Sequence, residues 1–413
     1  MKRNLRLWLL LLMGLLGHTT GLFGQTINEL LEEAFQHNVA LKALAEEYLA
    51  DLEIGAQHSQ LPNPVLGLAM FPLPVETRLG PQQLRLSASQ EFPWFGLLAQ
   101  KKDLEMTKAN AKLEQIAARQ LTIRYEMEQA YLQLYEIQAN QKIIRRSIPL
   151  WTTLERLALA KIESGKGNVA DVILVQLKRK ELEQELLIMD QQKTEAITTI
   201  NQLTQQPLER NITIEDSLTF AELPFVRDTL FAAIEDHHPM IKLFELQQSI
   251  SNKSIALNEL SVKPSFSLGL DYIFVGDRAD ATPMGNGRDI LQFRATVKVP
   301  IYRQKFRAKN REEQHRIKAL AWHKEEVRTK FFAEIEAALS DYKTTVLQKQ
   351  LYQEQIILTQ SAIQTLQAKY SAQSEGFEEL LYLQDQLIGY DLKILQAIVE
   401  SHRSLSRIRR FVF

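Results

Sequence analysis

The sequence predicts a mainly α-helical protein that carries four β-strands of membrane-spanning length and is internally duplicated. Three observations support this fold class. The 413 residues contain few glycines and prolines (16 and 13) and 24% charged residues, which is typical of helix-rich chains. Several runs of about nine residues alternate polar and apolar side chains, which indicates half-buried strands. A series of landmarks recurs in the same order in the second half, which indicates a repeat.

The first 24 residues have the pattern of a secretory signal peptide. Basic Lys2, Arg3 and Arg6 precede an apolar run of about ten residues, which is too short to span a bilayer. A membrane anchor is the alternative interpretation of this run. We expect cleavage after Gly24. The chain has no cysteine, so neither a lipid anchor on a cysteine nor a disulfide is expected. No long apolar helix follows, so any membrane crossing is expected to use β-strands.

The landmarks of the repeat lie about 200 residues apart. They predict a first structural repeat at residues 25–227 and a second at residues 228–413. The matching features are His37 and Lys42 with His237 and Lys242, Pro64–Leu68 with Pro264–Leu268, Pro93 with Pro300, and Gly167 with Gly376.

Each repeat is predicted to contain one β-hairpin, at about 64–92 and about 264–300, with loops at 72–83 and 276–289. The strands alternate with period two, and about nine residues is the length that a tilted strand needs to cross a membrane. One face of each strand is apolar. The opposite face carries the charged residues Arg85, Glu91, Asp271, Arg294 and Lys298.

The helices of each repeat are predicted to include one of exceptional length. Residues 96–163 and 305–372 contain a single internal proline, Pro149, which should kink the first helix. About 68 residues at 1.5 Å each give roughly 100 Å of helix. Within the first long helix, Ile123, Met127, Leu134 and Ile144 fall at coiled-coil spacing.

Shorter helices complete each repeat. A first helix is expected from a capping box of Thr26 and Glu29 to about residue 60, with a counterpart at 228–262 that breaks at His238. Turns at about 164–168 and about 373–377 lead into returning helices that end near 205 and 409. We expect Asn168 to cap the first of these, with Asp171 at its positive end. A segment at about 206–224, strand-like at Ile212-Thr213-Ile214, links the two repeats.

Four strands cannot close a barrel, and open strand edges are not tolerated in lipid. Other copies of the chain must therefore complete the sheet. Two copies would give eight strands with a filled interior, whereas three would give twelve strands and room for a passage. In such a barrel the charged strand residues named above would line the aqueous lumen.

The residues at these positions resemble the TolC-type outer-membrane efflux proteins over essentially all of residues 25–413. The resemblance rests on the ordered set of P-N-P at 62–64, P-x-F-x-L-x-L at 264–270, V-P-I-Y at 299–302 and the two glycine turns. It implies a homotrimer with a 12-stranded β-barrel in the outer membrane, four strands from each chain. A periplasmic α-helical barrel and an equatorial collar, here at about 206–224, would follow. The implied partners are a periplasmic adaptor protein and an inner-membrane pump.

The resemblance also assigns roles to the glycine turns, which in this family form the periplasmic tip that meets the adaptor and narrows to a gate. The positions that match are Gly165, Gly167, Asn168, Asp171, Gly376 and Phe377. This sequence departs from the family at the second tip. Leu381 and Gln384 stand where acidic residues are frequent, so a cation-attracting gate does not follow from the resemblance.

A cluster of aromatic residues marks the passage from strand to long helix. Phe92, Trp94 and Phe95 flank Pro93, which ends the strand, and Tyr302 follows Pro300 in the second repeat. Aromatic side chains gather where a β-barrel meets the edge of the membrane, so these four residues are expected to form the periplasmic rim. A buried aromatic cluster in a protein core is the alternative.

The implied function is that of an outer-membrane exit channel in a tripartite efflux system. The compact chain and the F-P-W-F-G segment are most similar to members that serve heavy-metal pumps. Drugs as cargo, a duct for type I polypeptide secretion, and a trimeric coiled-coil surface protein are the alternatives. No catalytic motif, cofactor site or metal site is evident, and His37, His237 and His238 are interpreted as polar helix or turn residues. The net charge of −1 argues against nucleic-acid binding.

Overall fold

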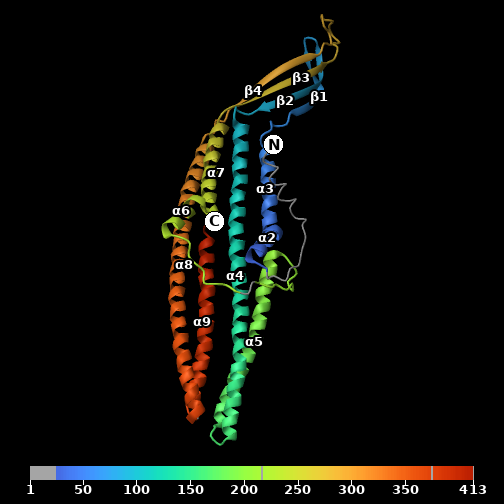
Figure 1. The fold of residues 1–413 in the computed structure, drawn as a ribbon. Helices are drawn as coiled ribbons and strands as arrows, with labels where there is room; N and C mark the ends of the chain where they lie inside the picture. Colours follow the sequence, from blue (N-terminus) through green and yellow to red (C-terminus); the bar gives the residue numbers. More distant parts are fainter. Residues whose placement is uncertain (1–24, 215–216, 374, 413) are drawn as a thin grey trace. The chain divides into compact units, whose positions relative to one another are not determined.

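The computed structural model describes residues 25–214, 217–373 and 375–412 (Figure 1). The predicted signal peptide, residues 1–24, lies outside the described residues. The chain forms two compact units. One comprises the described parts of Met1–His37, Ile123–Leu223 and Leu339–Ser406, and the other comprises Asn38–Thr122, Pro224–Ala338 and the described part of Arg407–Phe413.

The same order of elements occurs twice: two helices, two strands, a long helix and a returning helix. In the first half these are α2 (Ile27–His37), α3 (Val39–Gln57), β1 (Val65–Thr77), β2 (Gly80–Phe92), α4 (Leu97–Glu163) and α5 (Val169–Thr204). In the second half they are α6 (Arg227–His237), α7 (Pro239–Ser261), β3 (Ser265–Val275), β4 (Ile290–Lys298), α8 (Gln304–Gln373) and α9 (Phe377–Arg409). The evolutionary duplication of the sequence stays a prediction.

Helix boundaries follow local capping chemistry. The predicted capping box is confirmed, because the Thr26 N–H donates to Glu29 Oε2 (3.0 Å) and the Glu29 N–H donates to Thr26 Oγ1 (3.3 Å). The prediction of one helix up to residue 60 was wrong. The helix breaks at Asn38, whose extended backbone and side-chain oxygen cap α3 by accepting from the Ala40 and Leu41 N–H groups.

The two long helices are present as predicted, with 67 residues in α4 and 70 in α8. The predicted apolar stripe of α4 is buried, with Ile123, Met127, Leu134 and Ile144 fully shielded from solvent. Pro149 lies inside α4, and the helix continues through it.

Among the described residues, no helix combines the length and the apolarity that crossing a membrane requires.

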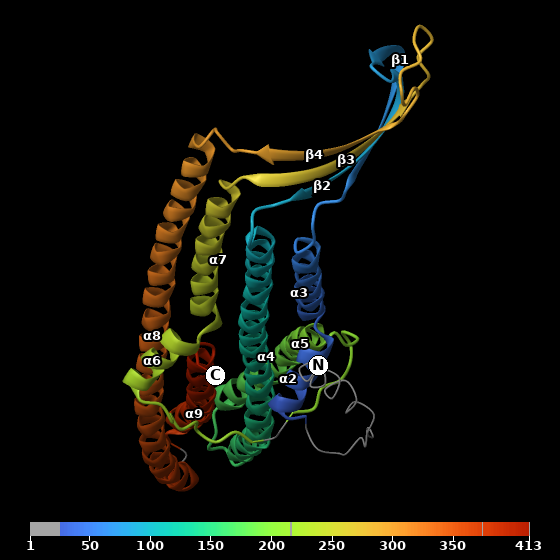
Figure 2. The same cartoon turned by 90° about the horizontal axis from the view of Figure 1, so that it is seen from above.

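In the unit that contains the sheet, helices α8, α7, α4 and α3 stand side by side in that order (Figures 1 and 2). Polar contacts join each neighbouring pair. The Asn258 side chain of α7 donates to the Phe306 carbonyl of α8 (2.8 Å). Lys253 of α7 pairs with Asp103 of α4 (2.5 Å), and Lys112 of α4 pairs with Glu47 of α3 (2.6 Å).

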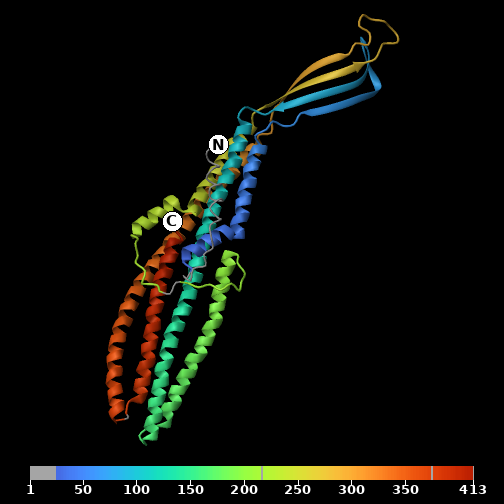
Figure 3. The same ribbon diagram turned by 45° about the vertical axis from the view of Figure 1, so that its right-hand side comes forward.

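The four strands form one curved antiparallel sheet in the order β1-β2-β3-β4 (Figure 3). The prediction of a loop at 72–83 was wrong, because β1 and β2 continue to a tight turn at residues 78–79. Pro72 and Pro74 are tolerated inside β1 because they lie in the register shift between Met70 and Val75, where β1 has no residue paired with β2.

The other unit contains two helical hairpins, α4–α5 and α8–α9, which lie next to one another (Figures 1 and 3). The segment that links the repeats is tied to a helix of each repeat. The Leu218 N–H donates to the Tyr135 hydroxyl (2.9 Å), and the Ala221 N–H donates to Ser401 Oγ (3.0 Å). Near its start, Ile214 forms a parallel bridge with Gln25. This segment therefore links helices α4 and α9.

His238 holds a structural position in the second half that corresponds to Asn38 in the first. Its Nδ1 accepts from the Met240 N–H (3.1 Å) and so caps α7. Its ring is 4% exposed and lies against the rings of Phe331 and Phe411, at 4.5 and 6.2 Å between centroids. Burial, together with the charge of Arg410, lowers the pKa of His238 to about 4. The folded protein therefore requires the neutral imidazole.

This environment predicts acid sensitivity. Since the pKa of His238 is lower when folded than its ordinary 6.5, its contribution is complete above pH 6.5 and is lost as the pH falls towards 4. Between pH 7 and pH 5 the loss is about 2 kcal/mol. We expect His238→Asn to lower the thermal transition midpoint at both pH values, because it leaves a void, but to reduce the difference between them. Asn retains a capping oxygen, as Asn38 shows. Circular dichroism during heating measures both midpoints, and an unchanged difference would contradict this role.

Candidate functional site: the two-faced sheet, its rim and the helical tips

The sheet has one face that is apolar and exposed to solvent in the single chain. The register aligns Leu66, Ala88, Leu270 and Phe293 in one row, and Leu68, Leu86, Tyr272 and Leu291 in the next. Leu66 is 79% exposed and Phe293 is 80% exposed. Soluble monomers rarely expose a contiguous apolar area of this extent. This face therefore requires another apolar surface or a lipid phase.

The opposite face is polar and collects the five predicted lumen residues Arg85, Glu91, Asp271, Arg294 and Lys298. Asp271 is 2% exposed, and its Oδ1 pairs with Arg294 Nη2 at 3.5 Å. Glu91 Oε1 accepts from Ser265 Oγ (2.8 Å). The charged groups are thus on the side away from the apolar rows, as the alternation of the strands predicts.

Within the described chain, β1 and β4 each pair with one strand and leave their second edges without a partner strand. An unpaired strand edge presents rows of N–H and C=O groups that favour pairing with another chain. Burial of the apolar face in lipid would leave those groups without water. The backbone groups of the two edges therefore need hydrogen-bond partners in the same arrangement that covers the apolar face.

The four predicted rim residues lie at the passage from strand to helix, and the alternative of a buried aromatic core does not fit their exposure. Phe95 is 83% exposed and Tyr302 is 79% exposed. Trp94 stacks on Phe266 at the end of β3 (6.0 Å) and contacts Phe95 edge-on (6.1 Å). Gly96 has φ +82°, a conformation that favours glycine and that turns the chain into α4.

The first tip is the turn between α4 and α5, and residues 163–170 are all exposed. Gly165 has φ +75°, and a Cβ on Gly167 would fall 2.5 Å from the Ile162 nitrogen, so both positions require glycine. The Asn168 side chain accepts from the Ala170 N–H (3.0 Å), which confirms the predicted cap. Burial and the charge of Glu378 raise the pKa of Asp171.

The second tip lies against the first. Gly376 has φ +81°, and the buried Phe377 packs on Tyr370 (4.6 Å between centroids). Lys161 of α4 donates to the Ser371 carbonyl (3.0 Å) and lies over the Tyr370 ring, while Lys178 of α5 pairs with Asp385 of α9 (2.8 Å). These contacts hold the two turns of one chain together.

Leu381 and Gln384, which replace frequent acidic residues of the similar family, are 8% and 3% exposed. Their side chains are therefore turned into the packing of this chain. The tip carboxylates nearby are Glu378, Glu379 and Asp385 instead.

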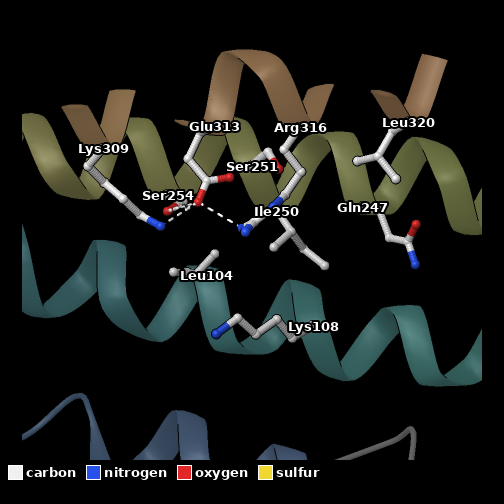
Figure 4. A pocket seen from close by; sticks show the side chains of 10 residues that line it. All are labelled: Leu104, Lys108, Gln247, Ile250, Ser251, Ser254, Lys309, Glu313, Arg316 and Leu320. Atoms are coloured by element: carbon white, nitrogen blue, oxygen red, sulfur yellow. Dashed lines mark hydrogen bonds and ion pairs between the residues drawn. The ribbon is translucent and has the colours of Figure 1, made fainter. Parts of the chain in front are cut away.

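A polar cluster that the sequence did not reveal lies where α4, α7 and α8 meet (Figure 4). It borders a cavity of about 310 Å³. Glu313 of α8 is 2% exposed at its side chain, and its Oε1 receives Lys309 (2.9 Å), Arg316 (3.0 Å) and Ser254 of α7 (3.2 Å). The spacing Lys309-x-x-x-Glu313-x-x-Arg316 is the only sequence signal for this cluster, and such spacing is common on solvated helix faces.

The electrostatics of Glu313 explain why it can be buried. Burial raises the pKa of Glu313, but the hydrogen bonds and charges of Lys309 and Arg316 and the nearby Ser251 hydroxyl outweigh it, so the pKa is lowered overall. Its Oε2 is buried without a hydrogen-bond partner. Among the described residues, no group of three or more His, Asp or Glu side chains could hold a metal ion.

No protein-family profile matches the chain, and no curated protein matches its sequence. Several solved structures share its fold. The outer-membrane channel OprN is 18% identical, with 93% of this chain and 89% of that chain covered and a TM-score of 0.74. CusC, described for transmembrane channel formation, is 16% identical, with 94% and 92% covered and a TM-score of 0.73. The outer membrane protein VceC from Vibrio cholerae is 14% identical, with 93% and 95% covered and a TM-score of 0.71. These likenesses confirm the predicted mainly helical fold with its small sheet.

The Glu313 cluster yields a stability prediction with an internal control. We expect Glu313→Gln to lower the free energy of unfolding by about 1–3 kcal/mol, because a buried charge-assisted contact is lost. Glu312→Gln is the matched control: Glu312 also contacts Lys309 (2.9 Å) and Arg316 (3.0 Å) but is 49% exposed. Its loss should cost below about 1 kcal/mol. Thermal unfolding followed by circular dichroism compares the two, and equal losses would show that burial of Glu313 contributes nothing.

Proposed function

We propose that this chain is one subunit of a homotrimeric outer-membrane exit channel of the TolC type. The observation that carries the proposal is the sheet, which combines an exposed apolar face, a charged opposite face and two unpaired edges. Three copies would supply twelve strands, close every edge and turn the charged face towards a water-filled lumen. The fold likeness to outer-membrane channels supports the same arrangement, and neither observation favours an enzyme.

The helices also present surfaces that suit a ring of copies. In the unit that contains the two hairpins, α5 and α8 are the outer helices (Figure 1). Each carries exposed apolar residues at spacings of four and then seven or ten residues: Ile173, Leu177 and Leu187 on α5, and Leu347, Leu351 and Leu358 on α8. We propose that α5 of one copy packs on α8 of the next. Such a head-to-tail contact forms a closed ring when the rotation between neighbouring copies is a whole fraction of a full turn.

In this proposal the chain lies in the outer membrane and extends into the periplasm. Residues 206–224 form the equatorial collar around the helical barrel. The tip turns, with Gly165, Gly167, Asn168, Asp171, Gly376 and Phe377, meet a periplasmic adaptor that connects to an inner-membrane pump. Cargo leaves passively. We propose heavy-metal cations as cargo, with drugs as the alternative.

Two other functions remain alternatives to efflux. A duct for type I secretion would use the same channel for a polypeptide. A trimeric coiled-coil surface protein would use the long helices, but it gives no reason for the charged face of the sheet.

Assembly tests the central proposal. We expect the purified protein in detergent to have the mass of three chains and to produce discrete conductance steps in planar bilayers. Light scattering with detergent correction and single-channel recording measure these properties. A monomer that stays in water without detergent would contradict the proposal.

The tip assignment is tested with paired charge variants. Lys166→Glu/Val169→Glu places two negative charges on exposed residues at the first turn, whereas Gln192→Glu/Lys193→Glu adds the same residues farther along α5. We expect the tip variant to bind the adaptor encoded beside its gene about ten-fold more weakly, the scale of one interface contact. The control should bind normally, and both should remain trimeric. Normal binding by the tip variant would argue against docking at this turn.

A further inference from the structure

The residues that lead from β4 into α8 carry an unusual run of positive charge. From Ile290 to Arg311 the chain contains no aspartate or glutamate, and it contains seven cations: Arg294, Lys298, Arg303, Lys305, Arg307, Lys309 and Arg311. Three of them are engaged, since Arg294 pairs with Asp271, Lys309 pairs with Glu312 and Glu313, and Lys305 lies over the Phe306 ring. The charge of the others needs a different explanation.

Three of these cations form a ridge. Arg303, Arg307 and Arg311 follow one another at spacings of four, so they lie on one face of α8. All three are exposed, and within the described chain no hydrogen bond or ion pair engages their guanidinium groups. The first turn of α8 contains no acidic residue. Cations near a helix N-terminus are unfavourable, because that end carries the positive pole of the dipole. The ridge is therefore costly unless an anion compensates it.

The packing of α8 shows which way this ridge faces. Helix α7 contacts α8 through the Phe306 carbonyl, Asn310 and Glu313, which are centred about a quarter turn from the ridge around the helix axis. Helix α6, which stands beside the row of helices rather than within it (Figure 2), contacts α8 elsewhere. Phe231 stacks on Phe332 (4.3 Å), Glu235 pairs with Arg328 (2.7 Å), and Arg227 pairs with Glu336.

Those contact positions repeat the ridge farther along the helix. Arg328, Phe332 and Glu336 follow Arg303, Arg307 and Arg311 by 25 residues, which is about seven helical turns. The ridge and helix α6 therefore share one face of α8. In the proposed helical barrel, a helix on the inner side of the row formed by α8, α7, α4 and α3 would occupy the lumen. Helix α6 and the ridge are therefore placed on the outer side of that row.

The ridge also lies at a defined level. Arg303 directly follows Tyr302 of the aromatic rim, and β4 ends five residues earlier at Lys298. From Arg303 to Arg307 the helix rises about 6 Å, close to the thickness of one headgroup layer. Arg303 and Arg307 are thus placed at the depth of lipid phosphates, if the apolar face of the sheet lies in the hydrocarbon.

We propose that Arg303 and Arg307 bind the phosphate groups of anionic phospholipids in the periplasmic leaflet of the membrane that the sheet spans. This inference rests on the proposed function, which supplies the membrane. Basic side chains next to a spanning segment attract anionic headgroups, and planar guanidinium groups suit bidentate contact with phosphate. The exposed side chains of the aromatic rim would lie at the boundary between acyl chains and headgroups. The two arginines would contact the headgroup phosphates.

The test measures lipid binding to the delipidated, detergent-solubilised full protein by native mass spectrometry. Phosphatidylglycerol and phosphatidylcholine are added separately. We expect the wild type to prefer phosphatidylglycerol, and Arg303→Gln/Arg307→Gln to bind it about thirty-fold more weakly, at about five-fold for each arginine. Lys318→Gln/Lys343→Gln, which removes two exposed cations farther along α8, should bind as the wild type does. Arg303→Lys/Arg307→Lys should keep most of the affinity, which shows that the fold is retained.

Several results would overturn the proposal. They are unchanged binding by Arg303→Gln/Arg307→Gln, an equal loss in the Lys318/Lys343 variant, or full competition by inorganic phosphate at matched ionic strength, which would indicate a site for free anions. A shift of single-channel ion selectivity in Arg303→Gln/Arg307→Gln would place the ridge in the lumen and overturn it as well. The same spectra report the number of chains. A protein without trimers would refute the proposed channel, whereas trimers without lipid preference would refute only this inference.

Discussion

The strongest constraint on this molecule is that, within one chain, its sheet leaves an apolar face and two strand edges uncovered. Its apolar rows face outward, its charged side chains face the other way, and β1 and β4 each keep one unpaired edge. Covering the apolar face with lipid makes the open edges more costly, because no water remains to satisfy their N–H and C=O groups. Closing the edges with other copies brings the charged faces together, which is tolerable only around water. The proposed closed barrel with a wet lumen would meet both requirements.

The two halves of the chain use the same kinds of residue to cap their helices and to end their strands. Asn38 and His238 both interrupt the descending helix and cap its continuation, one with an amide oxygen and the other with a ring nitrogen. Pro93 and Pro300 both follow the end of a strand, since proline cannot continue a hydrogen-bonded ladder. The two halves differ at the next step. The first needs Gly96 with positive φ to enter α4, whereas the second enters α8 through residues without that conformation.

Features that repeat along a single helix or strand could be predicted from the sequence. Features that depend on contacts between elements distant in sequence could not. Strand alternation and the apolar stripe through Ile123 and Met127 are properties of one element, so they were visible. The break at Asn38 was missed because asparagine inside a helical pattern gives the same signal whether or not it caps. The continuation of β1 through Pro72 was missed because only the register of the strands shows that this proline falls in an interruption of the ladder. The burial of Glu313 depends on three helices that are distant in sequence.

The charged side chains of the helices fall into two groups, those that pair with a neighbouring helix and those without an acidic partner in the chain. Exposed ion pairs such as Lys112 with Glu47 and Lys324 with Glu245 join neighbouring helices of the row. Each such pair contributes about 0–1 kcal/mol, so they help to set the alignment of the helices more than their stability. Other cations of these helices, such as Lys108, Lys253 and Arg316, also have an acidic partner within the chain. The ridge at Arg303 and Arg307 lacks one at the position where a partner outside the chain, the headgroup layer, would be in reach. Since these unpaired arginines lower the stability of the isolated chain, we attribute their presence to the lipid headgroups that would surround the assembled protein.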